Sequence, residues 1–331
     1  MALEPRSWQE ELAHSMNRIL YFSHDFKERR GGTDVLYDHV TVLRQNGFDA
    51  FIVHTAPNFR YQFGPTDVPV LYAGSRLDLD RDDVLVVPED HRAAIRACRN
   101  TVCRKVLFCQ NHHYIFQGLV PGEIWKDFGF SGYLCVSTPI QQAMRTWFGV
   151  EADIVRPGVD PVFFGDSSQR PEFPVTIAYM PRKGWDILDL VRGLFTACGF
   201  DKPTVMSWLE IDNMPREQVA AHLRKSHIYL STGTYEGLGL PPIEAMGARC
   251  LVVGFAGGGG LDYALRENGV WVPDDDPWAL ATTLKQTVVG LNDPDTRPAL
   301  LAKCEAGHGT ALKYSRAQFE RDLIRFWTAW R

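Results

Sequence analysis

The sequence has little that would mark a secreted, metal-bound or nucleic-acid-binding protein. Its seven cysteines are scattered and form no C-x-x-C pair, which excludes the usual zinc and dithiol motifs. They are predicted to be reduced core residues of a cytosolic protein. The formal net charge of −5 gives no general attraction to a polyanion, so we expect no nucleic-acid partner. Any anionic ligand must then be bound by local groups.

Long hydrophobic runs are also missing. No apolar stretch approaches the ~20 residues of a membrane-spanning helix, and the start, Met1 to Arg6, lacks the basic and apolar regions of a signal peptide. We therefore expect a cytoplasmic protein, with peripheral attachment to the inner face of a membrane as an alternative. Arg92, Arg96 and Arg99 share one face of a predicted helix. They form either a solvated face or a surface for anionic lipid or a charged acceptor.

What the sequence does contain is enough hydrophobic material for two domains. Its 331 residues exceed the ~150 that one domain usually holds, and 45% of them are hydrophobic. Short apolar runs alternate with helical patterns in both halves, which predicts two doubly wound α/β domains of the Rossmann type. Ligands of such sheets bind at the carboxyl ends of the strands. We predict a first domain at 1–157, a linker at 158–174, a second domain at 175–313 and a helix at 314–331.

The predicted elements follow this alternation. The last helix has an apolar stripe and is expected to face a core, packing back on the first domain. Strands are predicted at 19–23, 50–54, 84–87, 106–109, 132–136, 175–179, 204–207, 228–231 and 251–254. Other helices are predicted at 34–45, 91–101, 139–148, 184–198, 216–225, 242–248 and 278–291.

The most informative segment, residues 231–249, combines two glutamates with glycines and a proline pair. It leaves a predicted strand and enters a helix through Pro241 and Pro242, because proline is favoured at the first helical position. The positive end of this helix and its unpaired N–H groups predict a diphosphate site. Glu236 lies in the loop and Glu244 in the first helical turn, so they can address different parts of one extended ligand. Taken singly, each glutamate is as well explained by solvation or by the helix dipole.

The run E-G-L-G-L-P-P-I-E at 236–244 resembles the donor-site motif of the GT-B-fold glycosyltransferases, particularly retaining family 4, the glycosyl transferases group 1. The resemblance covers most of the chain and is strongest over 178–284. It implies two Rossmann-like domains facing each other across a cleft. In that family the first glutamate lies by the donor sugar and the second binds the ribose, which implies those roles for Glu236 and Glu244. The donor-site residues between them would be Gly237, Leu238, Gly239 and Leu240.

A basic pair, Arg182 and Lys183, precedes a glycine after the predicted strand 175–179. Arginine offers a forked contact and lysine a point charge, which together suit a diphosphate leaving group. A solvated surface pair is the plainer interpretation of these two residues alone. The family has a basic pair here too, but many members carry a further arginine earlier, where this chain has Ile177 and Ala178. The predicted phosphate clamp therefore rests on Arg182 and Lys183.

Two segments of the first half enter the predicted site through the same resemblance. Gly31 and Gly32 follow the first strand, where the family often has a glycine pair under the donor phosphates or the acceptor; a plain turn is the alternative. His112 and His113 follow the strand 106–109, where family members commonly place a histidine against the donor sugar. A structural histidine is the plainer interpretation. We place His113 with the catalytic candidates and His112 with the donor-binding ones, although the pattern does not decide which faces the sugar.

Two further patterns resemble known ligand sites, an NAD-binding loop and a metal-binding D-x-D motif. The glycine run 257–260 has no acidic residue at the end of a strand about 20 residues on, so it does not predict an NAD loop. Together with 269–281 it resembles the end of the family's donor domain, where the loop borders the nucleotide. Asp78 and Asp80 mimic the D-x-D metal motif of the other main glycosyltransferase fold, but they precede a strand, which favours a solvated turn. We expect no metal and no cofactor.

The resemblance implies a retaining, metal-independent glycosyltransferase, with a donor linked to UDP, GDP or dTDP. The acceptor would be a hydroxyl of a saccharide or of a lipid-linked molecule, in polysaccharide or glycoconjugate biosynthesis. The leaving diphosphate would be stabilised by Arg182, Lys183 and the helix N-terminus, and the sugar oriented by Glu236. No base is assigned, because the departing phosphate can take the acceptor proton. The alternatives are a GT-B-fold nucleotide-sugar epimerase or phosphorylase, and an inactive sugar-binding or scaffold subunit.

Overall fold

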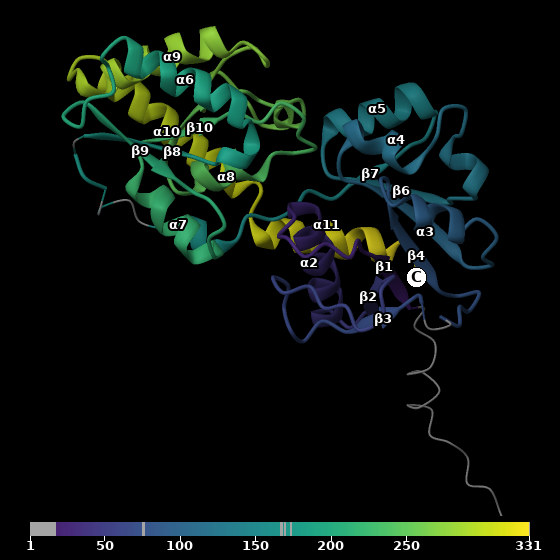
Figure 1. The fold of residues 1–331 in the computed structure, drawn as a ribbon. Helices are drawn as coiled ribbons and strands as arrows, with labels where there is room; N and C mark the ends of the chain where they lie inside the picture. The colour runs from purple at the N-terminus through teal and green to yellow at the C-terminus, as the bar shows by residue number, and fades with distance from the viewer. Residues whose placement is uncertain (1–17, 75–76, 166–167, 169, 173, 331) are drawn as a thin grey trace, which may run out of the picture. The chain divides into compact units, whose positions relative to one another are not determined.

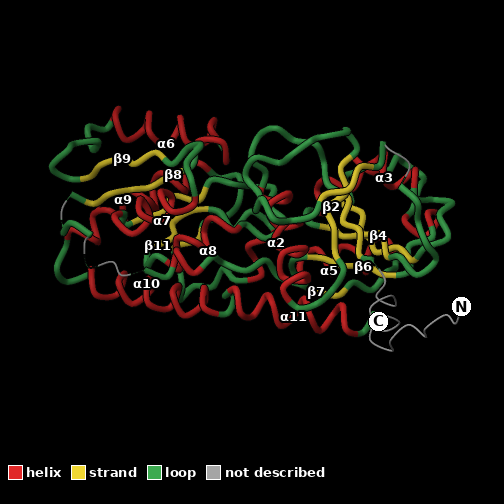
Figure 2. Tube along the Cα trace, turned by 90° about the horizontal axis from the view of Figure 1, so that it is seen from below, coloured by secondary structure: helices red, strands yellow, loops and turns green. Residues whose placement is uncertain are grey.

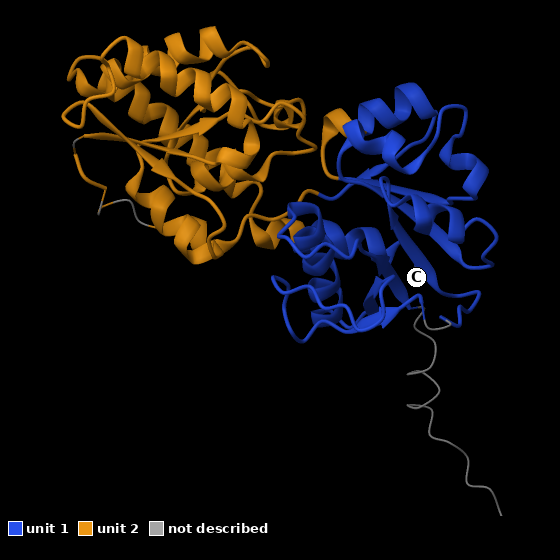
Figure 3. Ribbon diagram, in the orientation of Figure 1, with its two compact units in different colours: residues 1–135, 141–155, 320–331 blue, residues 136–140, 156–319 orange. Residues whose placement is uncertain are grey.

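The computed structural model describes residues 18–74, 77–165, 168, 170–172 and 174–330. It divides into two compact units, coloured separately in Figure 3. Unit 1 contains the described residues up to Cys135, together with Gln141–Val155 and the end of the chain from Glu320. Unit 2 contains Val136–Ile140 and Arg156–Phe319. Parts of the predicted first domain, linker and last helix, at 1–17, 75–76, 166–167, 169, 173 and 331, lie outside the described residues.

Unit 1 is built on a seven-stranded parallel sheet with the order β3-β2-β1-β4-β5-β6-β7. Its central strands are buried on both faces, so they read as apolar runs rather than as alternating patterns. The strands are β1 (Ile19–Phe22), β2 (Ala50–His54), β3 (Val70–Tyr72), β4 (Val84–Pro88), β5 (Arg104–Cys109), β6 (Gly132–Cys135) and β7 (Asp153–Ile154). The helices are α2 (Gly31–Gln45), α3 (Arg92–Ala97) and α4 (Ile115–Gly118), with α5 (Thr138–Phe148) and α11 (Arg316–Thr328), which begin in unit 2.

Unit 2 is built on a five-stranded parallel sheet with the order β12-β11-β10-β8-β9. Figure 1 shows α6 and α9 on one face of the strands and α7 on the other, and Figure 2 shows the same helices in red and the strands in yellow. The strands are β8 (Val175–Tyr179), β9 (Met206–Glu210), β10 (Ile228–Ser231), β11 (Leu251–Gly254) and β12 (Val270–Trp271). The helices are α6 (Trp185–Ala197), α7 (Arg216–Lys225), α8 (Leu240–Gly247), α9 (Pro277–Asn292) and α10 (Arg297–Leu312).

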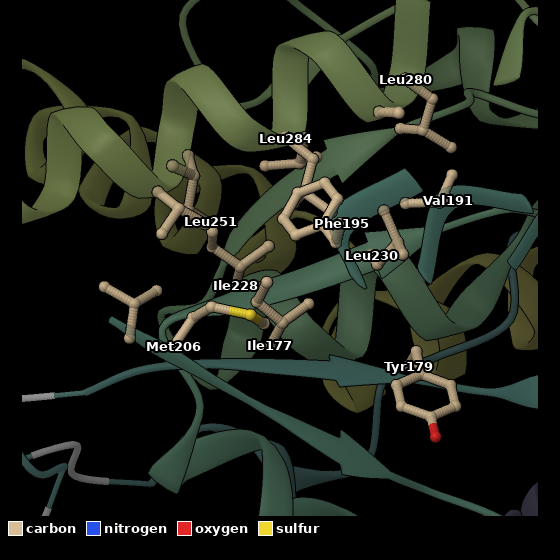
Figure 4. Close-up of a cluster of buried hydrophobic side chains, with 14 of the residues drawn as sticks. Ile177, Tyr179, Val191, Phe195, Met206, Ile228, Leu230, Leu251, Leu280 and Leu284 are labelled. Atoms are coloured by element: carbon tan, nitrogen blue, oxygen red, sulfur yellow. The ribbon is translucent and has the colours of Figure 1, made fainter. Parts of the chain in front are cut away.

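The core of unit 2 lies between this sheet and helices α6 and α9. Figure 4 shows Val191 and Phe195 from α6 and Leu280 and Leu284 from α9 over the apolar side chains of the strands. Phe195 is 1% exposed and the other three are fully covered. This packing leaves the loops at the carboxyl ends of the strands to carry the polar groups of a site.

The predicted alternation of strands and helices is confirmed, with four strands (β2, β8, β10 and β11) at their predicted bounds. β9 begins two residues later than predicted, because the amides of Val205 and Met206 both bond to the carbonyl of Lys202 in a turn. The short strands β3, β7 and β12 were not predicted. Helix α10 was also missed, since Gly307 and Gly309 interrupt its pattern.

The apolar stripe of α11 is buried. Phe319, Leu323, Phe326 and Trp327 are each at most 7% exposed. Within unit 1 the indole Nε1 of Trp327 donates to the hydroxyl of Tyr21 on β1 at 2.9 Å. Six of the seven cysteines are buried as predicted, but Cys198 is exposed because it follows the last turn of α6.

No helix in the described residues is long and apolar enough to cross a membrane. The predicted basic face of α3 is engaged by the protein itself. Arg92 Nε donates to the carbonyl of Gln117 at 2.9 Å, and Arg96 donates to the carbonyl of Gly118 and pairs with Glu123. These two arginines therefore fix the end of α4, which is a structural role.

Candidate functional site

The predicted basic pair lies in a short 3-10 turn, Pro181–Lys183, directly after β8. Arg182 is exposed, whereas Lys183 is half-buried. The backbone of this turn is held by Thr232, whose hydroxyl donates to the carbonyl of Lys183 at 2.8 Å. Thr232 follows β10, the neighbour of β8, so two adjacent strand ends form one side of the site.

The structure pairs two of the predicted site residues directly. Lys183 Nζ donates to Glu236 Oε1 at 2.5 Å, and the two side chains are 27% and 21% exposed. The pair is only partly screened by water, so it holds the ammonium group in one place. An anion that binds here meets a cation already oriented by a carboxylate.

Helix α8 begins two residues earlier than the predicted 242–248. Its first residue is Leu240, and its N-cap is Gly239 with φ 81°, a left-handed conformation that favours glycine. Glu244 is consequently in the second turn rather than the first. The two prolines at 241 and 242 are the second and third residues of the helix and have no N–H group. Of the first three residues of α8, only Leu240 therefore has an N–H group to offer to a ligand.

The loop before α8 supplies the missing donors. Among the described residues, the backbone amides of Gly237, Leu238, Gly239 and Leu240 have no hydrogen-bond acceptor. Gly237, Leu238 and Gly239 are buried. Buried amides are nearly always paired in folded proteins, so this run of donors predicts a ligand rich in oxygen acceptors.

A second glycine loop, after β11, fixes the backbone around Glu236. The amide of Glu236 donates to the carbonyl of Gly257, and its own carbonyl accepts from the amide of Gly259, both at 2.9 Å. A Cβ atom at Gly259 would lie 2.2 Å from the carbonyl oxygen of Gly237, so no larger residue fits there. The amides of Gly257 and Gly258 both donate to the carboxylate of Asp274 at 3.1 Å. The glycine run thus holds the backbone of Glu236, and the carboxylate of Asp274 holds the glycine run.

An open hollow lies against these loops and is lined, among others, by Lys183, Glu236 and Pro241. Two buried tyrosines, Tyr229 and Tyr263, also line it. Burial raises the pKa of the Tyr229 hydroxyl above its ordinary value, and the carboxylates of Glu236 and Glu244 raise it further. Arg182 has the opposite effect on the same group. The charges of Arg182, Glu236 and Glu244 therefore all influence the Tyr229 hydroxyl, which lines the hollow.

Sequence reasoning missed the groups that hold the site loops in place. Ser137 donates to the carbonyl of Gly237 at 2.6 Å, and the amide of Thr138 donates to Asp262 at 3.0 Å. These contacts place the segment 136–140 in unit 2, although the prediction assigned it to the first domain. Tyr263 donates to the carbonyl of Gly239 at 2.8 Å. The local sequence around these residues does not predict the distant residues that they contact.

Comparisons with known proteins show which proteins this chain resembles. Residues 211–297, which include both glutamates and the glycine run, match the family model for glycosyl transferases group 1. An "Alpha-1,6-glucosyltransferase" from Actinobacillus pleuropneumoniae is 26% identical over 253 residues, 74% of this chain and 75% of the relative. The chain is a glycosyltransferase of the GT-B fold.

Solved structures share the fold of this glycosyltransferase at low sequence identity. Sucrose-phosphate synthase from Thermosynechococcus elongatus is 13% identical with a TM-score of 0.69, over 95% of this chain and 98% of the other. The Anabaena protein Alr3699/HepE, solved in complex with UDP and glucose, is 13% identical with a TM-score of 0.68, over 95% of this chain and 100% of the other. The two parallel α/β sheets are therefore the two Rossmann-like domains of GT-B enzymes.

The candidate residues of unit 1 are held by a different set of contacts. Gly31 and Gly32 are the first two residues of α2, and the carbonyl of Gly32 accepts a hydrogen bond from Gln110 at 3.2 Å. A Cβ atom at Gly31 would meet nothing within 4 Å, and one at Gly32 would only touch the Gln110 side chain at 3.5 Å. The fold of the glycosyltransferase does not itself require glycine at either position.

The two candidate histidines differ in exposure. His112 is half-buried, and its Nδ1 is a buried nitrogen without a hydrogen-bond partner in the described chain. Burial, and then the neighbouring His113, lowers the pKa of His112 to about 4, so its ring is neutral at pH 7. His113 is exposed, and its amide is capped by the side chain of Asn111 at 3.0 Å. His112 therefore offers a neutral ring, and His113 an accessible one.

Among the described residues of this glycosyltransferase, no three His, Cys, Asp or Glu side chains are arranged as metal ligands. Asp78 and Asp80 lie in the exposed segment before β4, as the sequence predicted. One carboxylate oxygen of Asp80 accepts a hydrogen bond from the amide of Arg81 at 2.6 Å.

Proposed function

We propose that this glycosyltransferase transfers a sugar from a nucleoside-diphosphate sugar to a hydroxyl group of a saccharide acceptor in polysaccharide or glycoconjugate assembly, with retention of configuration and without a metal. One observation carries the proposal. The Lys183–Glu236 pair and Gly239, which lies in the run of unpaired amides from Gly237 to Leu240, line one hollow of unit 2. The solved complex of Alr3699/HepE with UDP and glucose supports a nucleotide-linked donor.

The diphosphate would be bound by the loop amides, with Lys183 and the exposed Arg182 adding positive charge. These donors are fixed before the reaction, so they can stabilise charge that develops on the leaving group without reorganising. Glu236 would then lie by the donor sugar. Glu244, in the second turn of α8, would bind the ribose hydroxyls.

In the proposed reaction the acceptor oxygen forms a bond to the anomeric carbon on the face from which the diphosphate leaves. The bond between that carbon and the phosphate oxygen breaks, and its electron pair stays with the diphosphate. The acceptor proton passes to the departing phosphate. The cations at 182 and 183 would perform the charge stabilisation that a metal supplies in other enzymes.

Binding calorimetry with UDP, GDP and dTDP in the presence of EDTA tests the donor site. Binding of one nucleotide with unchanged affinity in the chelator is expected. Affinity that disappears with EDTA and returns with Mg²⁺ would contradict metal independence. Product anomer analysis by NMR, after transfer from the α-linked donor, tests retention.

Substitution of Glu236 by Gln tests the chemistry. We expect binding of the nucleotide to persist and sugar transfer to fall by about two orders of magnitude, because the charge beside the sugar is lost. Glu267→Gln is the matched control, since Glu267 is an exposed glutamate of the same unit. Full activity of a folded Glu236→Gln variant would contradict the role of Glu236 beside the donor sugar. Donor turnover that needs no hydroxyl acceptor would point instead to an epimerase, and turnover with inorganic phosphate to a phosphorylase.

A further inference from the structure

A second polar site lies at the carboxyl edge of the sheet in unit 1. The strand order turns at β1, which pairs with β2 on one side and with β4 on the other. Ligands of doubly wound sheets bind at such a point, because the loops after the two strands diverge there. His24 follows β1, and Asp90 follows β4.

These two residues form a pair across the turning point. His24 Nε2 lies 2.9 Å from Asp90 Oδ1, and the side chains are 25% and 23% exposed. The carboxylate keeps the proton of the neutral ring on Nε2, so Nδ1 presents a lone pair. Within the described residues, Nδ1 of His24 has no hydrogen-bond partner. The pair therefore leaves one oriented acceptor atom beside solvent.

The imidazole plane of His24 is fixed by stacking. Its ring stacks on Phe26 at 4.7 Å and on His91 at 4.3 Å. The guanidinium of Arg30 lies 5.2 Å from the centre of the Phe26 ring and extends the stack. His91 is itself structural, because its Nδ1 accepts from the amide of Ala94 at the start of α3. Burial, followed by His24, lowers the pKa of His91 to about 4, so no positive charge on His91 opposes the stack at pH 7.

A neighbouring carboxylate–histidine pair shows the contrast. His54 bonds through Nδ1 to Asp25 at 2.8 Å and through Nε2 to the hydroxyl of Tyr37 at 2.9 Å. Its side chain is fully buried. Both ring nitrogens of His54 are used by the fold, so this pair is structural. His24 has the same type of partner but keeps one nitrogen available.

We propose that His24, oriented by Asp90, accepts a hydrogen bond from a hydroxyl group of the saccharide acceptor at this edge of unit 1. The proposal rests on the proposed function, which requires an acceptor but leaves its binding residues unassigned. A sugar offers many hydroxyl donors, and the imidazole Nδ1 is an acceptor held by a carboxylate and by two stacked rings.

The test measures acceptor and donor separately. UDP-glucose is supplied with methyl glycosides of glucose, galactose and N-acetylglucosamine, and the glycoside that gives the fastest transfer with the wild-type chain is the probe. In His24→Ala the KM for this glycoside is expected to rise about tenfold, the size of one lost hydrogen bond. The KM for UDP-glucose and the affinity for UDP are expected to stay within about twofold of wild type, since only acceptor contacts change.

Two further variants make the result specific. Asp90→Asn keeps the ring and its stack but weakens its orientation, so a smaller rise in the acceptor KM is expected, with donor binding again unchanged. Lys27→Ala is the matched control, because Lys27 is an exposed residue of the same loop. Circular dichroism and thermal melting confirm that each variant folds, and Asp90→Asn carries the test if His24→Ala does not fold.

The possible results separate this proposal from the function itself. An unchanged acceptor KM in both variants overturns the role of His24. Loss of UDP-glucose binding in His24→Ala also overturns it, because the residue would then belong to the donor site. A wild-type chain that binds no nucleotide sugar refutes the proposed function, and this proposal falls with it.

Discussion

The glycines of the two units serve different ends. In unit 2 the glycine loops are packed against each other, and a Cβ atom at Gly259 would lie 2.2 Å from the backbone of Gly237. In unit 1 a Cβ atom at Gly31 would meet nothing within 4 Å. Glycine at 259 is therefore explained by the fold, whereas glycine at 31 is not. The fold leaves glycine at 31 unexplained, and we propose that a ligand approaches the backbone there.

The largest effect is expected from a side chain placed at the close contact between Gly259 and Gly237 in unit 2. Gly259→Ala should push the Glu236 loop away from the glycine run, which removes donor binding and costs about 1–3 kcal/mol of unfolding free energy. Gly193→Ala is the matched control, since a Cβ atom there meets nothing within 4 Å. It should leave binding unchanged and raise stability by up to about 1 kcal/mol, because alanine is the better helix former. Nucleotide calorimetry and thermal melting measure both. Normal donor binding by Gly259→Ala would refute the role of this contact.

The next effect tests the contribution of a positive charge, rather than of the backbone, at the same donor site. Lys183→Ala should weaken nucleotide binding roughly 10- to 100-fold, because a charge-assisted contact to the diphosphate is lost. Its stability should change little, since the Lys183–Glu236 pair is partly exposed. Lys285→Ala, on an exposed lysine of α9, is the control. Equal nucleotide affinities in titrations of Lys183→Ala and wild type would remove Lys183 from the phosphate clamp.

A smaller effect is expected at the free glycine of unit 1. Gly31→Ala should fold with unchanged or slightly higher stability, because the position is the first of α2 and has space for a methyl group. Transfer should nevertheless fall several-fold if a ligand approaches this backbone. Steady-state transfer assays and melting curves compare the two quantities. Unchanged transfer would show that the glycine pair is a plain turn.

The last effect is on stability rather than on transfer, and it concerns a buried acid of unit 1. Burial, and then Asp90, raises the pKa of Glu89 from 4.5 to about 8. Between these pH values the folded chain keeps a proton that the unfolded chain has lost, so the free energy of unfolding falls as pH rises through this window. The slope is at most about 1.4 kcal/mol per pH unit.

Glu89→Gln should remove this slope, since a neutral amide replaces the acid and can still accept from the amide of Asn111. Glu28→Gln, at an exposed position of the same unit, should retain it. Hydrogen exchange of the β4 and β5 amides across pH 5 to 8 reports on unit 1 by itself. Identical slopes in wild type and Glu89→Gln would exclude the proton linkage.

The fold was largely predictable because its signal is local. Runs such as Val84 to Val87 are apolar throughout, and strands buried on both faces need that composition. The start of α8 was misplaced, because prolines are favoured early in a helix but here occupy the second and third positions after a left-handed glycine. Helix α10 was missed where Gly307 and Gly309 weaken a pattern that only tertiary packing supports.

By itself, the sequence determined the alternation of strands and helices and the chemistry available after each strand, since both depend on neighbouring residues. Only the tertiary structure decided which of those groups meet. Lys183 and Glu236 are 53 positions apart and become partners because they follow β8 and β10, which are adjacent parallel strands. His24 and Asp90 meet for the same reason, after β1 and β4. Strand order depends on contacts across the whole sheet, and no local pattern records it.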